Sequence, residues 1–212
     1  MKQKKIYWNN YYSKDFIVLK SSNFSKYCFK KYIKKKYKNK TLVDIGSGNG
    51  RDSIFFSKKK INVISIDESK TAIKKTKSYL QKHNLKNVDF RNINTNSKSF
   101  TKLGKFDFIY CRFFLHTLNE KEENKFFKAI PNLCKKKTSL IFLEFRTTRD
   151  PLMNKGKKIS KYERYTDHYR RFIDVNILAK KLKKNKCFKI ISRIEKFGLS
   201  RYKKENPHLC RL

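Results

Sequence analysis

The chain of 212 residues is long enough for one domain of ordinary size with a sizeable hydrophobic core. It contains no long uncharged apolar run and no apolar stretch near its start, so we expect no membrane span, no secretory signal and a cytoplasmic location. Its five cysteines occur singly, without a C-x-x-C pair, which argues against a zinc or redox site, so we expect unpaired thiols and no bound metal.

The formal net charge of +38 at pH 7 prompts the question of nucleic-acid binding. Most of the 55 basic residues are lysines spread through every polar stretch, and Gly and Pro are few, a mixture that resembles the coding bias of an AT-rich genome. The charge therefore does not by itself indicate a nucleic-acid partner, although it leaves one open. Arginine is the rarer cation, and we expect several arginines where a planar guanidinium is needed, with chance surface positions for the others.

Strand and helix patterns alternate along the chain, which predicts an α/β fold built on a parallel sheet. In chain order they are an aromatic segment at 6–12, a helix at 22–37, a strand at 41–45, a helix at 50–59, a strand at 61–66, a helix at 69–83 and a strand at 87–91. There follow a strand at 104–111, a helix at 120–133, a strand at 138–145, an aperiodic stretch at 146–171, a helix at 174–185, a strand at 187–195 and strand-like pieces near 198–202 and 208–212.

The most informative segment lies at residues 42–50, where the apolar strand Leu-Val-Asp-Ile runs into glycines at three alternate positions, Gly46, Gly48 and Gly50. The next strand ends on Asp67, whose carboxylate can accept hydrogen bonds from ribose hydroxyls. Glycines allow a sharp turn and close approach of a ligand, so the layout predicts a nucleotide pocket at the end of a parallel sheet. A dinucleotide loop would place its third glycine at Arg51; a domain that binds another nucleotide, or none, is the alternative.

Gly-x-Gly-x-Gly preceded by Val-Asp-Ile resembles motif I of the class I S-adenosylmethionine-dependent methyltransferases. The resemblance implies S-adenosyl-L-methionine as the cofactor. It also implies a Rossmann-like fold, with a seven-stranded, mostly parallel sheet, an antiparallel last strand and helices on both faces. Asp44 would then lie near the cofactor's amino acid moiety, and Asp67 would bind both ribose hydroxyls. The acid that contacts the adenine amino group in the family is replaced here by Asn94, with Asn92 as a neighbouring candidate.

The same resemblance defines one set of cofactor-binding residues, because the family binds its cofactor along the ends of successive strands. Backbone groups at the end of the fourth strand would line the cofactor's sulfonium side. The expected set is Asp44, Gly46, Ser47, Gly48, Gly50, Arg51, Asp67, Glu68, Asn94, Cys111 and Arg112.

Polar residues beyond the fourth and fifth strands are candidates for the acceptor side. His116 and His168 are possible general bases, and a helical turn would place His116 on one face with Arg112; a histidine satisfied by the backbone is the alternative. Glu144 and Arg146 share a strand face and would form a buried pair, either orienting both groups or serving structure alone. The expected substrate-binding residues are Arg112, Arg146, Tyr169, Arg170 and Arg171, and a solvated linker is the alternative for the last three.

No linker or repeat divides the chain, so we expect a single methyltransferase domain over residues 1–212. Its parts would be an N-terminal helical cap at 1–40, a cofactor-binding half at 41–145, an acceptor-side loop at 146–172 and a C-terminal helix with strands at 173–212.

Segments such as Tyr-Trp-Asn-Asn-Tyr-Tyr and Asp-His-Tyr-Arg-Arg-Phe-Ile-Asp resemble one bacterial branch of small-molecule methyltransferases, labelled tellurite-resistance-like and found with surface-polysaccharide genes. The branch implies a small-molecule or glycan-precursor acceptor, with O-methylation of a sugar- or phosphate-bearing, anionic or neutral compound. An RNA or DNA methyltransferase is one alternative, against which the absence of a (D/N)-P-P-(Y/F) motif argues. A non-catalytic module that binds S-adenosylmethionine is the other.

Overall fold

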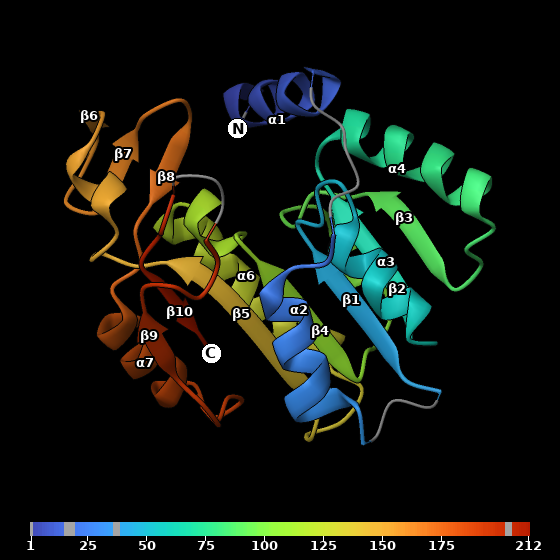
Figure 1. The fold of residues 1–212 in the computed structure, drawn as a ribbon. Coiled ribbons are helices and arrows are strands. Elements are labelled where there is room, and N and C mark those ends of the chain that lie inside the picture. Colours follow the sequence, from blue (N-terminus) through green and yellow to red (C-terminus); the bar gives the residue numbers. More distant parts are fainter. Residues whose placement is uncertain (1, 15–19, 36–38, 202–204) are drawn as a thin grey trace.

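The computed structural model describes residues 2–14, 20–35, 39–201 and 205–212. A seven-stranded sheet forms the middle layer, with strand order β3-β2-β1-β4-β5-β10-β9 (Figure 1). Its strands are β1 (Thr41–Ile45), β2 (Asn62–Asp67), β3 (Val88–Asn92), β4 (Phe108–Arg112), β5 (Leu140–Arg146), β9 (Ile194–Lys196) and β10 (Leu209–Arg211).

The strands β1 to β5 run parallel, and β10 lies antiparallel between β5 and β9. This is the Rossmann-like arrangement expected from the sequence, including the antiparallel last strand. In the register of the sheet, Asp44 of β1 lies beside Ser65 of β2 and Tyr110 of β4. The carboxyl ends of the three strands therefore meet at one edge, where the glycine loop begins.

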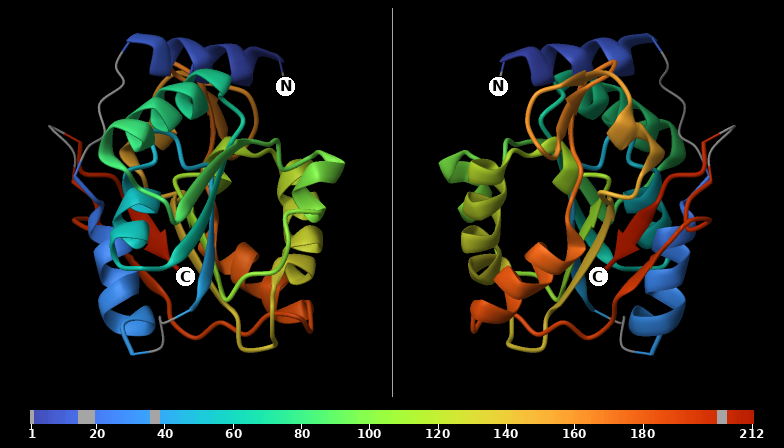
Figure 2. Two further views of the ribbon diagram at one scale, coloured as in Figure 1. Left: turned by 90° about the vertical axis from the view of Figure 1, so that its right-hand side faces the viewer. Right: turned by 90° about the vertical axis from the view of Figure 1, so that its left-hand side faces the viewer.

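Helices cover both faces of the sheet (Figures 1 and 2). On one face, α2 (Asn23–Cys28), the π-helical turn η1 (Phe29–Ile33), α3 (Arg51–Lys58) and α4 (Lys70–His83) enclose a core that includes Phe56, Phe90 and Tyr110. On the other, α5 (Lys98–Thr101), α6 (Glu120–Leu133) and α7 (Val175–Lys184) enclose a second core. Since both faces are buried, the central strands are almost continuously apolar in sequence.

Side-chain caps determine where several helices begin. Ser22, Ser69 and Asp174 each accept a backbone N–H of the first helical turn, as the sequence predicts for α2, α4 and α7. Asn119 and Glu122 form a reciprocal capping box at the start of α6. These local bonds explain why the helix starts agree with the sequence pattern to within about one residue.

Four segments differ from the prediction. The aperiodic stretch holds a 3₁₀ turn, η3 (Pro151–Asn154), and a three-stranded antiparallel sheet of β6 (Lys157–Lys158), β7 (Glu163–Tyr165) and β8 (Tyr169–Arg171), strands too short to show a period. The strand predicted at 187–195 is wrong except at its end, because its partner β10 is short. The piece near 198–202 is a turn over its described residues, and residue 202 lies outside them. The helix predicted at 22–37 becomes π-helical from Phe29, and residues 36 and 37 lie outside the described part.

No helix in the described part of the chain has the length and apolar character needed to cross a membrane. All five cysteines are free thiols, which confirms the expectation from their spacing. Within residues 2–14, 20–35, 39–201 and 205–212, no three His, Cys, Asp or Glu side chains gather as a metal site would require.

Candidate functional site

The glycine loop joins β1 to α3 in left-handed backbone conformations. The φ angle is +73° at Gly46, +55° at Gly48 and +71° at Gly50, a region that other residues rarely adopt. A Cβ atom on Gly46 would lie 2.7 Å from the Phe114 ring, and one on Gly50 would lie 2.6 Å from the Phe90 ring. Both the backbone angles and the neighbouring rings therefore restrict these positions to glycine.

Asp67 ends β2 and faces the glycine loop. Its Oδ2 accepts the N–H of Gly48 and its Oδ1 accepts the N–H of Ser69, each at 2.8 Å. Burial raises the pKa of the carboxyl, and the two backbone N–H groups oppose that rise. The carboxylate is thus fixed in orientation while each oxygen keeps a lone pair for a ligand.

A cavity of about 440 Å³ lies along the loop and the ends of β1, β2 and β4, a size suited to a small molecule. Most residues of the expected cofactor-binding set line it: Asp44, Gly46, Ser47, Gly48, Arg51, Asp67, Glu68, Asn94 and Arg112. The other two do not. Gly50 is the N-cap of α3, and the Cys111 side chain is buried in the core on the α6 side of the sheet.

Asn94 and Asn92 have different roles around this cavity. Asn94 lines it, but its Oδ1 accepts the backbone N–H of Asn96 at 2.7 Å. Asn92 donates from Nδ2 to the main-chain oxygens of Asp67 and Glu68, at 3.0 and 2.9 Å. Asn92 therefore braces the turn that carries Asp67, and Asn94 is the amide placed at the cavity.

Asp44 is a buried carboxyl at the cavity wall, only 3% exposed. Its Oδ2 accepts a hydrogen bond from Ser53 Oγ at 2.5 Å. Burial is the largest influence on this group and raises its pKa to about 8, with the negative charges of Asp52 and Asp67 acting in the same direction. In the ligand-free protein Asp44 is therefore mainly neutral at pH 7.

The raised pKa of Asp44 gives stability a pH dependence. In the unfolded chain an aspartate titrates near pH 4, so the folded protein holds the proton more tightly. The favourable contribution is complete below about pH 4 and is lost as the pH rises through about 8. The parent loses this contribution progressively between these two pH values, so we expect Asp44→Asn to melt at a higher temperature than the parent by a margin that grows from pH 5 to about pH 8. Thermal melts without ligand from pH 5 to 9 measure this, and parallel curves for the two proteins would contradict it.

Helix α1 (Lys2–Lys14) lies at the top of Figure 1, above the edge where the carboxyl ends of the parallel strands meet. Trp8, Tyr11 and Tyr12 line the cavity from this side. The Tyr12 hydroxyl lies directly over Gly48, 2.1 Å from the place where a Cβ atom would be. These aromatic residues belong to the N-terminal cap expected from the sequence, but none of them was among the expected site residues, although their density at residues 7–12 was the available signal.

Polar contacts join α1 to both sides of the cavity. On one side, at the β2–α4 turn, Asn9 Oδ1 accepts a hydrogen bond from Ser69 Oγ at 2.9 Å. On the other side, the Tyr7 hydroxyl donates to Asp167 Oδ2 at 2.6 Å in the β7–β8 turn. Lys4 also pairs with Glu122 of α6 at 2.7 Å. Helix α1 therefore covers the cavity and is held in place by polar contacts on both sides.

Three arginines expected at the acceptor side already have carboxylate partners. Arg146 binds Asp150 through Nη1 at 3.0 and 3.1 Å and Glu205 through Nη2 at 2.7 Å. Arg170 pairs with Asp167, and Arg171 pairs with Glu123. Of the expected substrate-binding set, Arg112 and Arg146 line the cavity, whereas Tyr169, Arg170 and Arg171 stabilise the β7–β8 hairpin and its contacts.

His116 lies in η2 (Leu115–Thr117), where it is 5% exposed and does not line the cavity. Burial and the nearby arginines hold its pKa well below the usual value, so the ring is neutral. Its Nδ1 has no hydrogen-bond partner among the described residues. The expected helical face shared with Arg112 is wrong, because Arg112 ends β4 before the 3₁₀ turn begins.

His168, like His116, does not line the cavity. Its Nδ1 is 2.9 Å from Asp167 Oδ2, and its ring centroid lies 4.5 Å from that of Tyr7 and 5.0 Å from that of Trp8. Burial, with the charge of Arg170, lowers its pKa to about 4. The ring is thus neutral at pH 7 and supports α1 from below.

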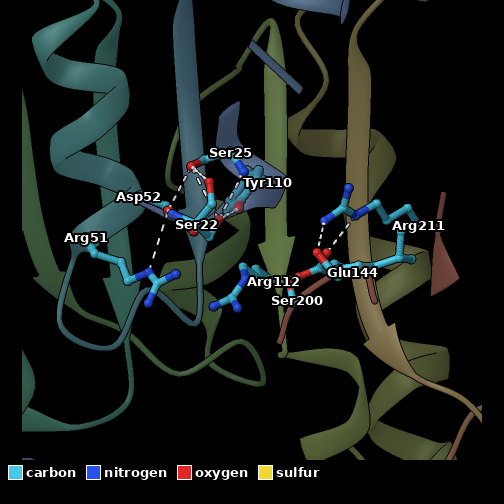
Figure 3. A network of polar contacts seen from close by, with 10 residues as sticks. Ser22, Ser25, Arg51, Asp52, Tyr110, Arg112, Glu144, Ser200 and Arg211 are labelled. Carbon is cyan, nitrogen blue, oxygen red and sulfur yellow. Dashed lines mark hydrogen bonds and ion pairs between the residues drawn. The ribbon is translucent and has the colours of Figure 1, made fainter. Parts of the chain in front are cut away.

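Glu144 lies at the centre of a buried polar network (Figure 3). Its Oε1 accepts hydrogen bonds from Arg112 Nε and Ser200 Oγ, each at 3.0 Å, and its Oε2 accepts one from Arg211 Nε at 2.7 Å. The expected pair between Glu144 and Arg146 is wrong, because Arg146 is held by Asp150 and Glu205 instead. Glu144 thus links the cavity wall to β10.

Phe113 follows β4 with φ of +54°, although it is not glycine. Its ring lines the cavity, and the Arg112 guanidinium lies 4.3 Å from the ring centroid. Strained backbone of this kind is concentrated at ligand sites. This position supports the cavity as the functional centre of the molecule.

The sheet order, the glycine loop and the acid at the end of β2 define the class I methyltransferase architecture. Residues 36–193 match the protein-family model described as "Methyltransferase domain", so the chain belongs to this family of S-adenosylmethionine-dependent methyltransferases. No curated protein matched the sequence.

Several solved structures share the fold. One is a protein of Pyrococcus horikoshii OT3, with a TM-score of 0.68, 19% identity, and coverage of 89% of this chain and 86% of the other. A S-adenosylmethionine-dependent methyltransferase of Methanosarcina mazei gives a TM-score of 0.67 at 17% identity, over 84% and 95% of the two chains. Magnesium protoporphyrin IX methyltransferase of Synechocystis PCC 6803, solved with bound S-adenosylmethionine, gives 0.60 at 15% identity, over 84% and 71%. At these identities the likeness concerns the fold.

Proposed function

We propose that the cavity binds S-adenosylmethionine and that the protein methylates an oxygen of a small molecule or glycan precursor carrying a sugar or phosphate group. The observation that carries the donor site is Asp67, held by two backbone N–H groups beside the glycine loop with lone pairs left for a ligand. The residues fit a ribose there, because a carboxylate accepts hydroxyl hydrogen bonds and the glycines leave the backbone approachable.

When bound, S-adenosylmethionine supplies an electrophilic methyl group on a sulfonium centre. The chain's own contribution is to hold and orient. Asp67 would accept the ribose hydroxyls, and Asp44 would ionise beside a cationic amino group, since an opposite charge lowers the pKa of a carboxyl. The aromatic residues of α1 would exclude water from the cavity. Good alignment of reacting groups can supply several kcal/mol of rate enhancement.

The positions of His116 and His168 favour an acceptor oxygen that is already anionic. An alcohol would need a general base within hydrogen-bond reach. Neither His116 nor His168 lines the cavity, and the carboxylates Glu122 and Glu205 that do line it are paired with Lys4 and Arg146. A phosphate oxygen carries its charge beforehand and needs no base. This supports a phosphate-bearing acceptor over a neutral hydroxyl compound, in line with the resemblance of several segments to the surface-polysaccharide branch.

The position of α1 over the cavity favours a small acceptor over a nucleic acid. The helix covers the cavity and is fastened on both sides by hydrogen bonds and an ion pair. A base of RNA or DNA would have to enter with its backbone attached, which a covered cavity of about 440 Å³ does not favour.

Titration calorimetry with S-adenosylhomocysteine tests the donor site. We expect the parent protein to bind it and Asp67→Ala to bind about 100-fold more weakly, because two hydrogen bonds to a charged acceptor are lost. Asp89→Ala is the matched control, since Asp89 is an exposed carboxylate on neighbouring β3 that pairs with Arg91. A folded parent that fails to bind, or equal affinities for the two variants, would sink the proposal. Methyl transfer to sugar phosphates but not to the free sugars would then support the acceptor class.

A further inference from the structure

Two arginines face the inner part of the cavity from different elements. Arg51 is the first residue of α3, and Arg112 is the last residue of β4. Both line the cavity, and the charge of Arg112 lowers the pKa of Arg51, second only to burial. Figure 3 shows both guanidinium groups on the same side of the polar network. Like charges in such a position repel unless an anion separates them.

The carboxylate nearest to Arg51 is already saturated. Asp52 Oδ1 accepts hydrogen bonds from Ser22 N at 2.7 Å and Ser25 Oγ at 2.9 Å. Its Oδ2 accepts them from Ser22 Oγ and Tyr110 Oη, each at 2.8 Å. Arg51 Nε remains 3.9 Å from Asp52 and, though buried, has no hydrogen-bond partner among the described residues. A buried, unmatched guanidinium N–H is costly unless a ligand satisfies it.

The second carboxylate is engaged as well. Glu144 is shared by Arg112, Arg211 and Ser200, and it takes only Nε of Arg112. The network of Figure 3 thus contains three guanidinium groups but only two carboxylates among the residues drawn. The remaining N–H groups of Arg112 form a fork of the kind that binds planar anions.

We propose that Arg51 and Arg112 form an anion subsite that takes one carboxylate or phosphate group between them. The subsite lies in the cavity of the proposed function and rests on that cavity being the ligand site. Two sources would present the same chemistry, namely the carboxylate of the methyl donor and an anionic group of the acceptor. The other arginines assigned to the acceptor side from sequence, Arg146, Arg170 and Arg171, are not equivalent, because their own carboxylates neutralise them.

The test uses the full chain with Arg51→Met, which removes the charge and keeps much of the side chain's length. Arg51 makes no hydrogen bond through Nε, so we expect the ligand-free melting temperature to stay level or rise. A clear fall would show that the guanidinium is satisfied within the protein and would overturn the proposal. Arg91→Met is the matched control, since Arg91 is a surface arginine paired with Asp89. Arg112→Met is the poorer choice because it removes an ion-pair partner of the buried Glu144.

Three probes separate the two sources. S-Adenosylhomocysteine carries the donor carboxylate, 5′-methylthioadenosine lacks it, and inorganic phosphate stands for an acceptor anion. If the donor carboxylate is the ligand, Arg51→Met weakens S-adenosylhomocysteine binding about 10- to 100-fold and leaves methylthioadenosine binding within about twofold. If the acceptor supplies the anion, S-adenosylhomocysteine binding is unchanged, and the thermal stabilisation of the parent by phosphate is lost in the variant.

Retention by Arg51→Met of both S-adenosylhomocysteine affinity and phosphate stabilisation would overturn the subsite. Failure of the proposed function looks different, since the parent would then bind neither adenosine compound. The phosphate measurement still tests the arginine pair in that case.

Discussion

Replacing Glu144 with glutamine is expected to lower the free energy of unfolding by about 3–5 kcal/mol. Glu144 is 1% exposed and holds Arg112 and Arg211 through separate oxygens. Glutamine keeps one acceptor oxygen but removes the charge, so two buried guanidinium groups lose their counter-ion. A typical domain is stable by only about 5–15 kcal/mol, which makes this a large fraction of the total. The cavity wall and β10 would loosen together, because Arg112 belongs to one and Arg211 to the other.

Urea unfolding followed by circular dichroism measures the effect of Glu144→Gln. Glu195→Gln is the matched control, because Glu195 pairs with Arg193 at 2.7 Å near the surface. A partly exposed pair of this kind contributes about 1 kcal/mol or less. Equal losses in the two variants would show that the buried network has no special weight, contrary to our expectation.

Gly50→Ala is the second substitution with a large expected effect. The left-handed backbone at Gly50 costs about 1–2 kcal/mol for an L-residue. In addition, the new methyl group would lie 2.6 Å from the buried Phe90 ring and 2.8 Å from Thr76, and such overpacking costs about 1–3 kcal/mol. We expect a combined loss of about 2–5 kcal/mol. Affinity for S-adenosylhomocysteine should fall as well, because a shift of Gly50 displaces Gly48 and Arg51.

Gly198→Ala separates the two contributions to the Gly50 result. Gly198 has a similar φ of +79°, but a Cβ atom there would meet nothing within 4 Å. Its substitution should therefore cost only the backbone contribution, about 1–2 kcal/mol. Both variants are compared by urea unfolding and by calorimetry. If Gly50→Ala is no more destabilising than Gly198→Ala, the packing of Phe90 against the loop is not what requires glycine.

The fold was predictable because its signals are local. Each central strand is an apolar run of about five or six residues that ends in a glycine or a polar residue, and Ser69 and Asp174 mark helix starts by direct backbone bonds. The position of Asp67 at the cavity followed from the strand end, since parallel strands deliver their carboxyl ends to one edge, and that of Asp44 was implied by the resemblance to motif I.

The partners of the charged residues were not predictable in the same way. Alternation along β5 correctly puts Glu144 and Arg146 on one face, yet Glu144 binds Arg211, 67 residues away, and Arg146 binds Glu205, 59 residues away. Such pairs depend on how β10 returns to the sheet, which no local pattern records. The prediction that His116 and His168 reach the site failed for a related reason. Their distance from the cavity is set by η2 and the β7–β8 hairpin rather than by sequence spacing.

The placement of α1 also has a thermodynamic consequence. One helix contacts the β2–α4 turn through Asn9 and the β7–β8 turn through Tyr7, on opposite sides of the cavity. The first ligand to bind bears the conformational entropy cost of ordering α1. The second ligand then binds to a helix that is already ordered, so its own entropy cost is smaller. The two binding events are then linked through a shared wall, and the linkage must be equal in both directions. Donor and acceptor would thus bind cooperatively through α1, in addition to their direct contact at the methyl group that is transferred.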